Sequence, residues 1–150
     1  MLLSIIIVLL GLGLDRGSKL WAISTLKGTK GIEVIKNYFT LDYLENRGAA
    51  FGMMQNRQWL FVLITIAVMV FIIGYMIKRK PQYKLTNISL AMIISGAIGN
   101  LIDRLYYNYV VDFIMVHYKN VYYFPTFNVA DMLVCVGTFF LLICILKDEI

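Results

Sequence analysis

Two aspartates, Asp112 and Asp131, lie 19 residues apart in stretches that are otherwise apolar. Burying a carboxylate in a membrane costs at least about 2.5 kcal/mol, so an ionisable group there is a candidate functional residue. Two carboxylates held close together cannot both ionise easily, and they share a proton. One can act as a base towards water while the other donates to a carbonyl oxygen. This is the chemistry of amide hydrolysis without an acyl-enzyme.

Other catalytic or metal-binding residue types are poorly arranged in this chain. No serine, cysteine or histidine set offers a better nucleophile. Cys135 and Cys144 lie in an apolar helical run without metal-ligand spacing, and we expect them to be small buried hydrophobic residues. His117 has no neighbours that complete a zinc-ligand set. We therefore expect no metal and no other cofactor, since a phosphate-binding loop is also missing.

The composition indicates a membrane protein. Of the 150 residues, 60% are hydrophobic and 15% are charged, and the mean hydropathy is +0.75. Soluble domains are about half apolar and a quarter charged. The net charge of +5 does not indicate nucleic-acid binding, because the basic residues cluster at the edges of the apolar runs. A single domain over residues 1–150 is expected.

Four hydrophobic segments are long enough to cross a hydrocarbon core as helices, which takes about 20 residues. They cover residues 2–21, 59–77, 85–102 and 129–146. The first lacks the charged start and cleavage site of a secretory signal peptide, so we expect it to be retained. The predicted fold is an α-helical polytopic membrane protein with four transmembrane helices and a small extracytoplasmic β-sheet.

Residues 78–84 (KRKPQYK) set the predicted orientation, because they carry four positive charges and no acid. Short loops this basic face the cytoplasm. Both termini are then cytoplasmic, and the loops over 22–58 and 103–128 are extracytoplasmic. The loop over 22–58 is also net basic, but it is long and its charge is mixed.

The second outer loop is predicted to carry Asp112 back to Asp131. Residues 110–118 and 121–127 are rich in strand formers and flank Lys119-Asn120, a two-residue turn; residues 38–44 are also strand-like. In such a hairpin Asp112 lies near Phe127, at the mouth of the fourth helix. A one-residue slip would turn Asp112 to the other face.

The same topology gathers further polar side chains on the outer side. They are Asp15, Arg16 and Lys19 in the first helix, Glu45, Asn46 and Arg47 in the first outer loop, Asn100, Asp103 and Arg104 at the end of the third helix, and Asn128. On the third helix, Ala91, Ser95 and Gly99 form a ridge of small residues that lets another helix approach closely.

Purely structural roles stay open for these polar residues. Asn128 is a good N-cap, with Asp131 at the third helical position. The other structural roles are a surface pair for Asp15 and Lys19, an interfacial charge cluster for Asp103 and Arg104, and a turn for residues 45–48.

Five blocks of this sequence resemble those of the bacterial lipoprotein signal peptidases, or type II signal peptidases. The blocks are residues 14–19 (LDRGSK), 45–52 (ENRGAAFG), 96–104 (GAIGNLIDR), 110–113 (VVDF) and 124–131 (FPTFNVAD). They occur in family order, and the four-helix layout spans nearly the whole chain.

The resemblance implies a membrane-embedded aspartic endopeptidase. It would remove the signal peptide of a prolipoprotein by cleaving before a lipobox cysteine that already carries a diacylglyceryl group. Asp112 and Asp131 match the catalytic dyad. Supporting or substrate-binding positions are matched by Asp15, Lys19, Asn46, Gly48, Asn100, Asp103, Arg104, Asn128 and Ala130.

The resemblance also implies an extracytoplasmic β-sheet cradle and inhibition by globomycin-type peptides. The expected location is the bacterial cytoplasmic membrane, crossed several times, with the active site near the outer leaflet. The expected partners are prolipoprotein substrates and membrane lipids, and a monomer suffices because one chain supplies both aspartates.

The chain departs from the family pattern at three positions. Asn108 stands where glycine is frequent, and asparagine is the next most tolerant residue for a left-handed backbone. Arg47 and Gly52 stand where threonine and serine are common, which leaves the details of substrate fit in doubt.

Two other functions stay open. A small proton-coupled transporter could use the same carboxylates, although the internal repeats and broken helices typical of transporters are missing from the sequence. A non-catalytic four-helix scaffold would explain the ridge of small residues but not the gathered aspartates and asparagines.

Overall fold

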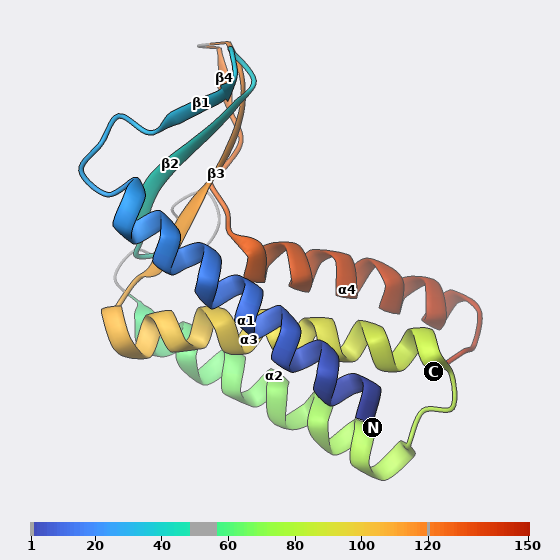
Figure 1. The fold of residues 1–150 in the computed structure, drawn as a ribbon. Helices are drawn as coiled ribbons and strands as arrows, with labels where there is room; N and C mark the ends of the chain where they lie inside the picture. The colour runs from blue at the N-terminus through green and yellow to red at the C-terminus, as the bar shows by residue number, and fades with distance from the viewer. Residues whose placement is uncertain (1, 49–56, 120) are drawn as a thin grey trace.

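The computed structural model describes residues 2–48, 57–119 and 121–150, which form four helices and one four-stranded sheet (Figure 1). The elements in chain order are α1 (Leu2–Thr25), β1 (Ile32–Ile35), β2 (Phe39–Asn46), α2 (Gln58–Arg79), α3 (Lys84–Tyr107), β3 (Val110–Tyr118), β4 (Tyr122–Tyr123) and α4 (Val129–Leu146). The sheet projects from one end of the helical bundle. Both termini and the α2–α3 connection lie at the other end.

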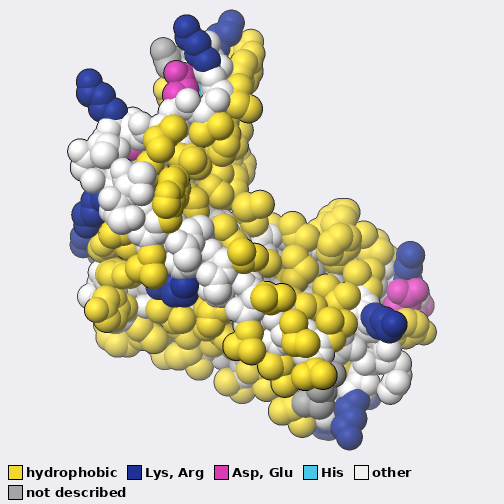
Figure 2. Space-filling view, viewed as in Figure 1, with side chains coloured by type: hydrophobic (Ala, Val, Ile, Leu, Met, Phe, Trp, Pro, Cys, Tyr) yellow, Lys and Arg dark blue, Asp and Glu magenta, His cyan; other side chains and the backbone are white. Residues whose placement is uncertain are grey.

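Three helices, α2, α3 and α4, are long and apolar enough to cross a membrane. In α1, by contrast, Asp15, Arg16 and Lys19 fall within five residues, which lowers its hydropathy. Hydrophobic side chains cover much of the helical face seen in Figure 2, and lysines and arginines gather towards the two ends. The chain is therefore a helical membrane protein with three candidate apolar spans among its described residues, and the expectation of four is not confirmed.

Two helices run past their predicted ends, which were residues 21 and 102. The last turn of α1 continues to Thr25 because Ala22 and Leu26 pack against Val111 and Phe113 of β3. The helix α3 continues to Tyr107, so Asp103 and Arg104 are helical rather than part of a loop. It ends at Asn108, whose φ of 60° and N–H bond to the Arg104 carbonyl, at 3.2 Å, form a left-handed C-cap. The prediction that asparagine sustains this turn is confirmed.

The helix α3 is the centre of the bundle, because ten of its residues are buried, against two in α2. Its small residues let α1 and α4 approach closely. Ser95 faces Gly11 of α1 and donates to the Val8 carbonyl at 3.2 Å. A Cβ added at Gly99 would lie 2.5 Å from the Asp15 carboxylate. The predicted ridge is thus a packing surface.

The sheet has the strand order β1-β2-β3-β4, and every pairing is antiparallel. In its register Asp112 of β3 lies opposite Leu44 of β2. The strand β3 also pairs with β4, and the Phe113 N–H donates to the Phe127 carbonyl at 3.1 Å. The expected hairpin and the nearness of Asp112 to Phe127 are confirmed, while Asn120 of its turn lies outside the described residues.

Candidate active site

The Asp112 and Asp131 carboxylates are brought together by amide groups from three directions. On Asp112, Oδ1 accepts from Asn128 Nδ2 at 2.6 Å and Oδ2 accepts from Asn46 Nδ2 at 2.8 Å. On Asp131, Oδ1 accepts from Asn100 Nδ2 at 2.7 Å and Oδ2 accepts from the Asn128 backbone N–H at 3.2 Å. All four carboxylate oxygens therefore have a donor, and Asn128 contacts both aspartates.

Asn128 is also the N-cap of α4, as one structural alternative predicted. Its Oδ1 accepts from the Asp131 N–H at 3.0 Å, and Asp131 returns a bond to the Asn128 N–H, which completes a capping box. The capping uses the carbonyl end of the side-chain amide. The Nδ2 end donates to Asp112 Oδ1 and also to Asn100 Oδ1, the latter at 3.2 Å. Capping and contact with Asp112 therefore coexist.

Behind these amides lies a buried charge cluster, which we call the α1–α3 cluster: Asp15, Arg16 and Lys19 of α1 with Asp103 of α3. The Lys19 ammonium lies 3.0 Å from Asp15 Oδ2 and 2.9 Å from Asp103 Oδ2, and all three side chains are fully buried. Arg16 lies 2.6 Å from Asp103 Oδ1. The interpretation of Asp15 and Lys19 as a surface pair is therefore wrong, because α3 covers both of them.

The α1–α3 cluster holds the backbone just before each candidate aspartate. Asp15 Oδ1 accepts from the Ala130 N–H at 3.0 Å, and Asp103 Oδ2 accepts from the Val111 N–H at 3.1 Å. The first bond fixes the residue before Asp131, and the second fixes the residue before Asp112. Because Lys19 pairs with both Asp15 and Asp103, one cation links the two carboxylates that hold these backbone N–H groups.

Asp103 and Arg104 do not form the charge cluster that the sequence left open, since they point in different directions. Asp103 is buried against Lys19, whereas Arg104 lines a cavity and lies over the Phe61 ring at 5.1 Å. Arg104 Nη1 donates to the Asn100 carbonyl at 3.5 Å. Its buried Nε has no hydrogen-bond partner among the described residues.

The interpretation of residues 45–48 as a turn is wrong, because Glu45 and Asn46 belong to β2 and lie opposite Val111 and Val110 of β3. The backbone just after the strand orients Asn46. The Gly48 N–H donates to Asn46 Oδ1 at 3.0 Å, so the Nδ2 end of the amide faces Asp112. The neighbouring Glu45 pairs instead with Lys27 and Arg47, on the exposed side. Of the departures from the family pattern, Arg47 is thus turned away from the aspartates, and Gly52 lies outside the described residues.

Both aspartates open into one cavity of about 480 Å³, which we call the aspartate cavity. Its lining residues are Asn46, Gly48, Asn100, Arg104, Val110, Asp112, Phe124, Pro125, Thr126, Phe127, Asp131, Met132, Cys135 and Val136. Six of the predicted site residues are among them. The others lie outside the lining. Asn128 and Lys19 contact Asn100 directly, and Asp15, Asp103 and Ala130 act through backbone bonds next to the two aspartates.

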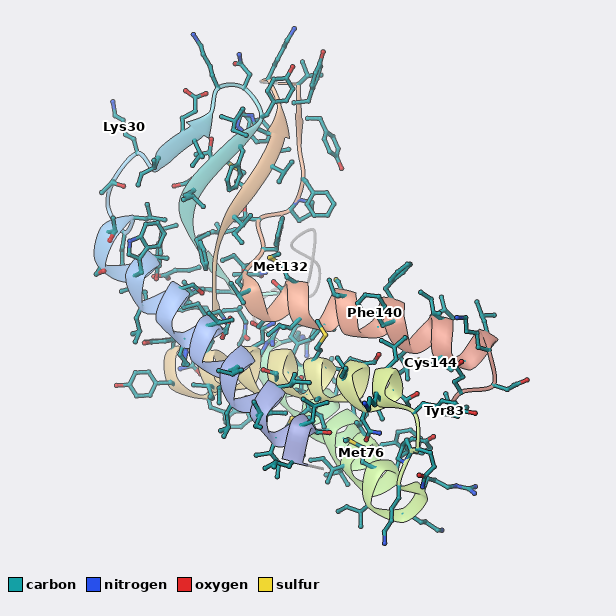
Figure 3. All side chains as sticks on the ribbon, turned by 45° about the vertical axis from the view of Figure 1, so that its right-hand side comes forward. Lys30, Met76, Tyr83, Met132, Phe140 and Cys144 are labelled. Carbon is teal, nitrogen blue, oxygen red and sulfur yellow. The ribbon has the colours of Figure 1, made fainter. Side chains whose placement is uncertain are left out.

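Sequence reasoning missed the apolar wall of the aspartate cavity. Met132, Cys135 and Val136 follow Asp131 along α4, and Figure 3 shows Met132 near the sheet end and Cys144 towards the other end. The prediction of two buried cysteines is wrong for Cys135, which is exposed, and holds for Cys144. The signal was the helical spacing: Met132, Cys135 and Val136 stand at i, i+3 and i+4 and so share one face, and Cys135 lies four residues after Asp131.

His117 lies in the sheet, away from the aspartate cavity. Its ring nitrogens contact Thr40 Oγ1 at 3.1 Å and the Lys119 carbonyl at 2.9 Å, and the ring stacks on Tyr123. These contacts account for the histidine by packing within the sheet.

Burial raises the pKa of Asp112 to about 7, and the nearby negative charge of Asp131 acts in the same direction. The hydrogen bonds from Asn46 and Asn128 lower this pKa, because they favour the ionised carboxylate. A carboxyl whose pKa is raised towards neutral pH accepts or releases a proton more readily there than one with the ordinary value.

Comparisons with known proteins assign this arrangement to a family. Residues 7–147 match the family described as signal peptidase (SPase) II. The chain is 51% identical over 146 residues to the lipoprotein signal peptidase of Clostridium novyi, covering 97% of this chain and 99% of that protein. It is 51% identical over 147 residues to that of Clostridium tetani, covering 98% and 94%.

The fold also matches a solved structure described as a bacterial membrane enzyme. The TM-score is 0.87 and the identity 31%, over 99% of this chain and 95% of the other. These matches define the class of the protein as a membrane-embedded peptidase. Within that class, the chain belongs to the signal peptidase II family.

Proposed function

We infer that this chain is an aspartic endopeptidase that removes the signal peptide from diacylglyceryl-modified prolipoproteins. Cleavage falls before the lipidated cysteine, and Asp112 and Asp131 activate the water. The observation that carries this proposal is the convergence of four N–H donors on the four oxygens of two carboxylates in one cavity. The lipoprotein signal peptidases to which the chain is similar support the substrate class.

The proposed reaction uses one proton shared by the two carboxyl groups. The ionised carboxylate removes a proton from water, and the protonated partner donates its proton to the scissile carbonyl oxygen. When the tetrahedral intermediate breaks its C–N bond, the carboxyl that took the water proton gives it to the leaving amine, and the other carboxylate takes a proton from a hydroxyl of the intermediate, which restores the shared proton. The raised pKa of Asp112, about 7, supports a role for this carboxyl as the proton carrier near neutral pH.

The remaining walls of the aspartate cavity suit a lipidated peptide. The Nε–H of Arg104, which has no partner among the described residues, could donate to a peptide carbonyl oxygen. Phe124, Met132 and Val136 offer an apolar surface for acyl chains. Asn46, Gly48, Asn100 and Asn128 support the aspartates, and Ala130 acts through its backbone N–H.

The proposed placement has one domain, residues 1–150, with four membrane-spanning helices. Arg16 and Lys19 of α1 are paired with Asp103, and Lys19 is also paired with Asp15, which reduces the cost of placing α1 in a membrane. The basic residues 78–84 favour cytoplasmic termini in the bacterial cytoplasmic membrane. The aspartates then lie near the outer leaflet beside an extracytoplasmic sheet. A monomer without a cofactor is sufficient, because one chain supplies both carboxylates.

The transporter and scaffold alternatives are less well supported. Asp131 lies in the first turn of α4 and Asp112 on a strand, at the sheet end of the bundle, whereas transporter sites lie near the midplane between broken helices. A purely structural role as a scaffold does not explain two carboxylates in a cavity.

The test is cleavage of a lipobox peptide by the purified protein in detergent or lipid. We expect cleavage before the cysteine, a strong preference for the diacylglyceryl-modified peptide, and inhibition by globomycin. Asp112→Asn and Asp131→Asn should each lower turnover by about 10²-fold or more, and Asp42→Asn, on β2 outside the cavity, should not. Folded wild type that leaves the lipidated peptide intact, or an active aspartate variant, would refute the proposal or remove that residue from the dyad.

A further inference from the structure

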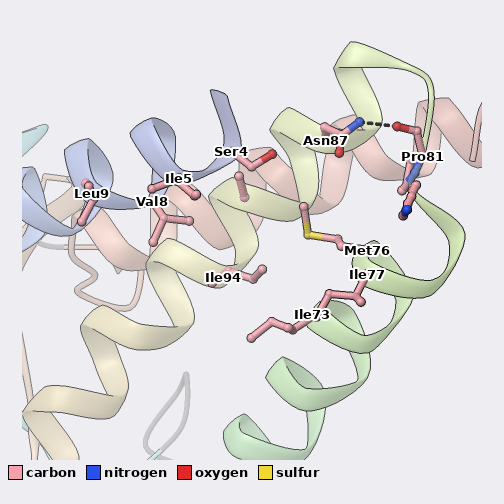
Figure 4. Close-up of a pocket in the computed structure, with 12 residues that line it drawn as sticks. Ser4, Ile5, Val8, Leu9, Ile73, Met76, Ile77, Pro81, Asn87 and Ile94 are labelled. Carbon is pink, nitrogen blue, oxygen red and sulfur yellow. Dashed lines mark hydrogen bonds between the residues drawn. The ribbon is translucent and has the colours of Figure 1, made fainter. Parts of the chain in front are cut away.

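A second cavity, of about 410 Å³, lies at the end of the bundle remote from the sheet, and the proposed reaction does not use it (Figure 4). We call it the remote cavity. Its lining residues come from α1 (Ser4, Ile5, Val8 and Leu9), from α2 and the residues after it (Ile73, Met76, Ile77, Lys80 and Pro81) and from α3 (Asn87, Ala91 and Ile94). Its volume is within the range of ligand pockets, roughly 300–1,000 Å³.

The lining changes from polar to apolar along the helices. The helix α2 runs towards the α2–α3 connection, while α1 and α3 run away from it. The polar lining residues, Ser4, Lys80 and Asn87, therefore lie nearest the connection, and Val8, Ile73 and Ile94 lie deeper. From Lys80 to Ile73 the helix rises about 10 Å. A polar mouth above an apolar channel of this depth fits an amphiphile with its chain pointing into the bundle.

The mouth of the remote cavity is positively charged. Lys80 lines it, and Lys78, Arg79 and Lys84 are close by in the chain. No acid is among the lining residues, and none of the four cations forms an ion pair with an acid among the described residues. The Glu149 carbonyl near the chain's end is held by Thr86, which does not line the cavity.

An unsatisfied polar group at the mouth also indicates a ligand. The Ser4 side chain is 7% exposed, and its Oγ has no hydrogen-bond partner among the described residues. Buried hydroxyl groups are nearly always satisfied, because an unpaired one costs roughly 1–3 kcal/mol. In Figure 4 the Ser4 oxygen points towards the side on which Asn87 lies. A ligand oxygen at the mouth would satisfy it.

We propose that the remote cavity binds one anionic phospholipid, with an acyl chain between Val8, Ile73 and Ile94 and its phosphate at Lys80 and Ser4. The cations of the mouth, which form no ion pair with an acid among the described residues, favour a headgroup with net negative charge over a zwitterionic one. The same charge disfavours the positively charged start of a signal peptide at this end. The site is therefore a lipid site separate from the aspartate cavity.

Native mass spectrometry of the delipidated protein in detergent tests this proposal without any peptide substrate, so its outcome is independent of the proposed function. We expect phosphatidylglycerol to be retained at least about fivefold better than phosphatidylcholine of the same chains. Glycerol 3-phosphate, which has no acyl chain, should not compete at equal concentration. Lys80→Gln should lower phosphatidylglycerol retention about fivefold, and Lys78→Gln, in the same basic segment but outside the lining, should change it little.

A second pair of variants tests the position of the acyl chain. Ile77→Trp narrows the remote cavity and should abolish retention, whereas Val70→Trp, on α2 outside the lining, should not. Both positions are exposed, at 58% and 66%, so both variants should fold, as gel filtration would verify. Equal retention of the two lipids, equal losses from Lys78→Gln and Lys80→Gln, or competition by glycerol 3-phosphate would overturn the proposal.

Discussion

The Lys19 ammonium lies 3.0 Å from the side-chain oxygen of Asn100, and this contact sets which end of the amide faces Asp131. An ammonium group only donates hydrogen bonds, so Oδ1 of Asn100 must face Lys19. Nδ2 is then directed at the Asp131 carboxylate. A residue that lies outside the aspartate cavity thus orients a donor inside it.

Lys19→Met should destabilise the protein and abolish cleavage. It leaves the buried Asp15 without its cation and removes one of the two cations at Asp103, and breaking a buried pair in this way costs about 3–5 kcal/mol. Thermal unfolding in detergent and a cleavage assay measure both effects. Lys27→Met is the control, because Lys27 forms an exposed pair with Glu45 and its loss should change little. Wild-type melting and turnover in Lys19→Met would contradict the linking role.

Asn128→Ser separates helix capping from the contact with Asp112. Serine retains an N-cap oxygen for α4 but has no amide to reach Asp112. We expect turnover lower by about tenfold or more together with some loss of stability, since the lost bond to a charged group contributes about 1.5–3 kcal/mol, but a higher melting temperature than in Asn128→Ala, which also loses the cap. Asn128→Ala should lower turnover and also cost roughly 1 kcal/mol of stability. If Asn128→Ser turns over as fast as wild type, Asn128 is only a cap.

Two substitutions should shift the pKa of Asp112 in opposite directions. Asn46→Ala removes a bond that favours the ionised form, so the pKa should rise above about 7. Asp131→Asn removes a negative charge, so the Asp112 pKa should fall. Infrared spectra of isotope-labelled aspartate against pH measure the carboxyl directly. Shifts in the same direction in both variants would show that neither contact controls this pKa.

The raised pKa of Asp112 also makes the stability depend on pH. The carboxyl binds its proton more tightly in the folded state than at its ordinary value of 3.8, so protonation stabilises the fold. This contribution is fully present below about pH 4 and is lost as the pH rises through about 7. Denaturation against pH should show this decline in wild type and not in Asp112→Asn.

Gly96→Ala should displace α4 and lower turnover. An added Cβ would meet the Ala130 carbonyl, next to Asp131, and would lie 2.8 Å from Val134 Cγ2. Overpacking of this kind costs about 1–3 kcal/mol. Gly13→Ala is the matched control, because nothing lies within 4 Å of its added Cβ. Its stability should be unchanged or slightly higher, through better helix propensity. Equal behaviour of the two variants would rule out a close α3–α4 contact.

Modification of Cys135 should block cleavage, because this thiol lines the aspartate cavity one helical turn beyond Asp131. A small membrane-permeant methanethiosulfonate should inactivate wild type and leave Cys135→Ser active. Cys144 is buried and should react slowly, as mass spectrometry of the labelled protein would report. Inactivation of Cys135→Ser at the wild-type rate would place the sensitive group elsewhere.

The sequence by itself determined the helical membrane character, the hairpin that returns Asp112 to α4, and the cap at Asn128. These features depend on local signals: apolar runs of membrane length, alternation of strand formers, and capping residues at fixed spacing. The packing ridge of α3 was also readable, because small residues at four-residue spacing form one face.

Only the tertiary structure decided what surrounds the two aspartates. The i, i+4 spacing of Asp15 and Lys19 left a surface pair open, yet both side chains are buried against α3, where Lys19 also pairs with Asp103. The exposure of Cys135 and the apolar wall of the aspartate cavity likewise follow from how α4 meets α3 and the sheet. The physical reason is that the free energy cost of burying a charge depends on which groups pair with it. Those partners come from helices separated by tens of residues along the chain. A local sequence pattern does not predict how close such residues lie in space.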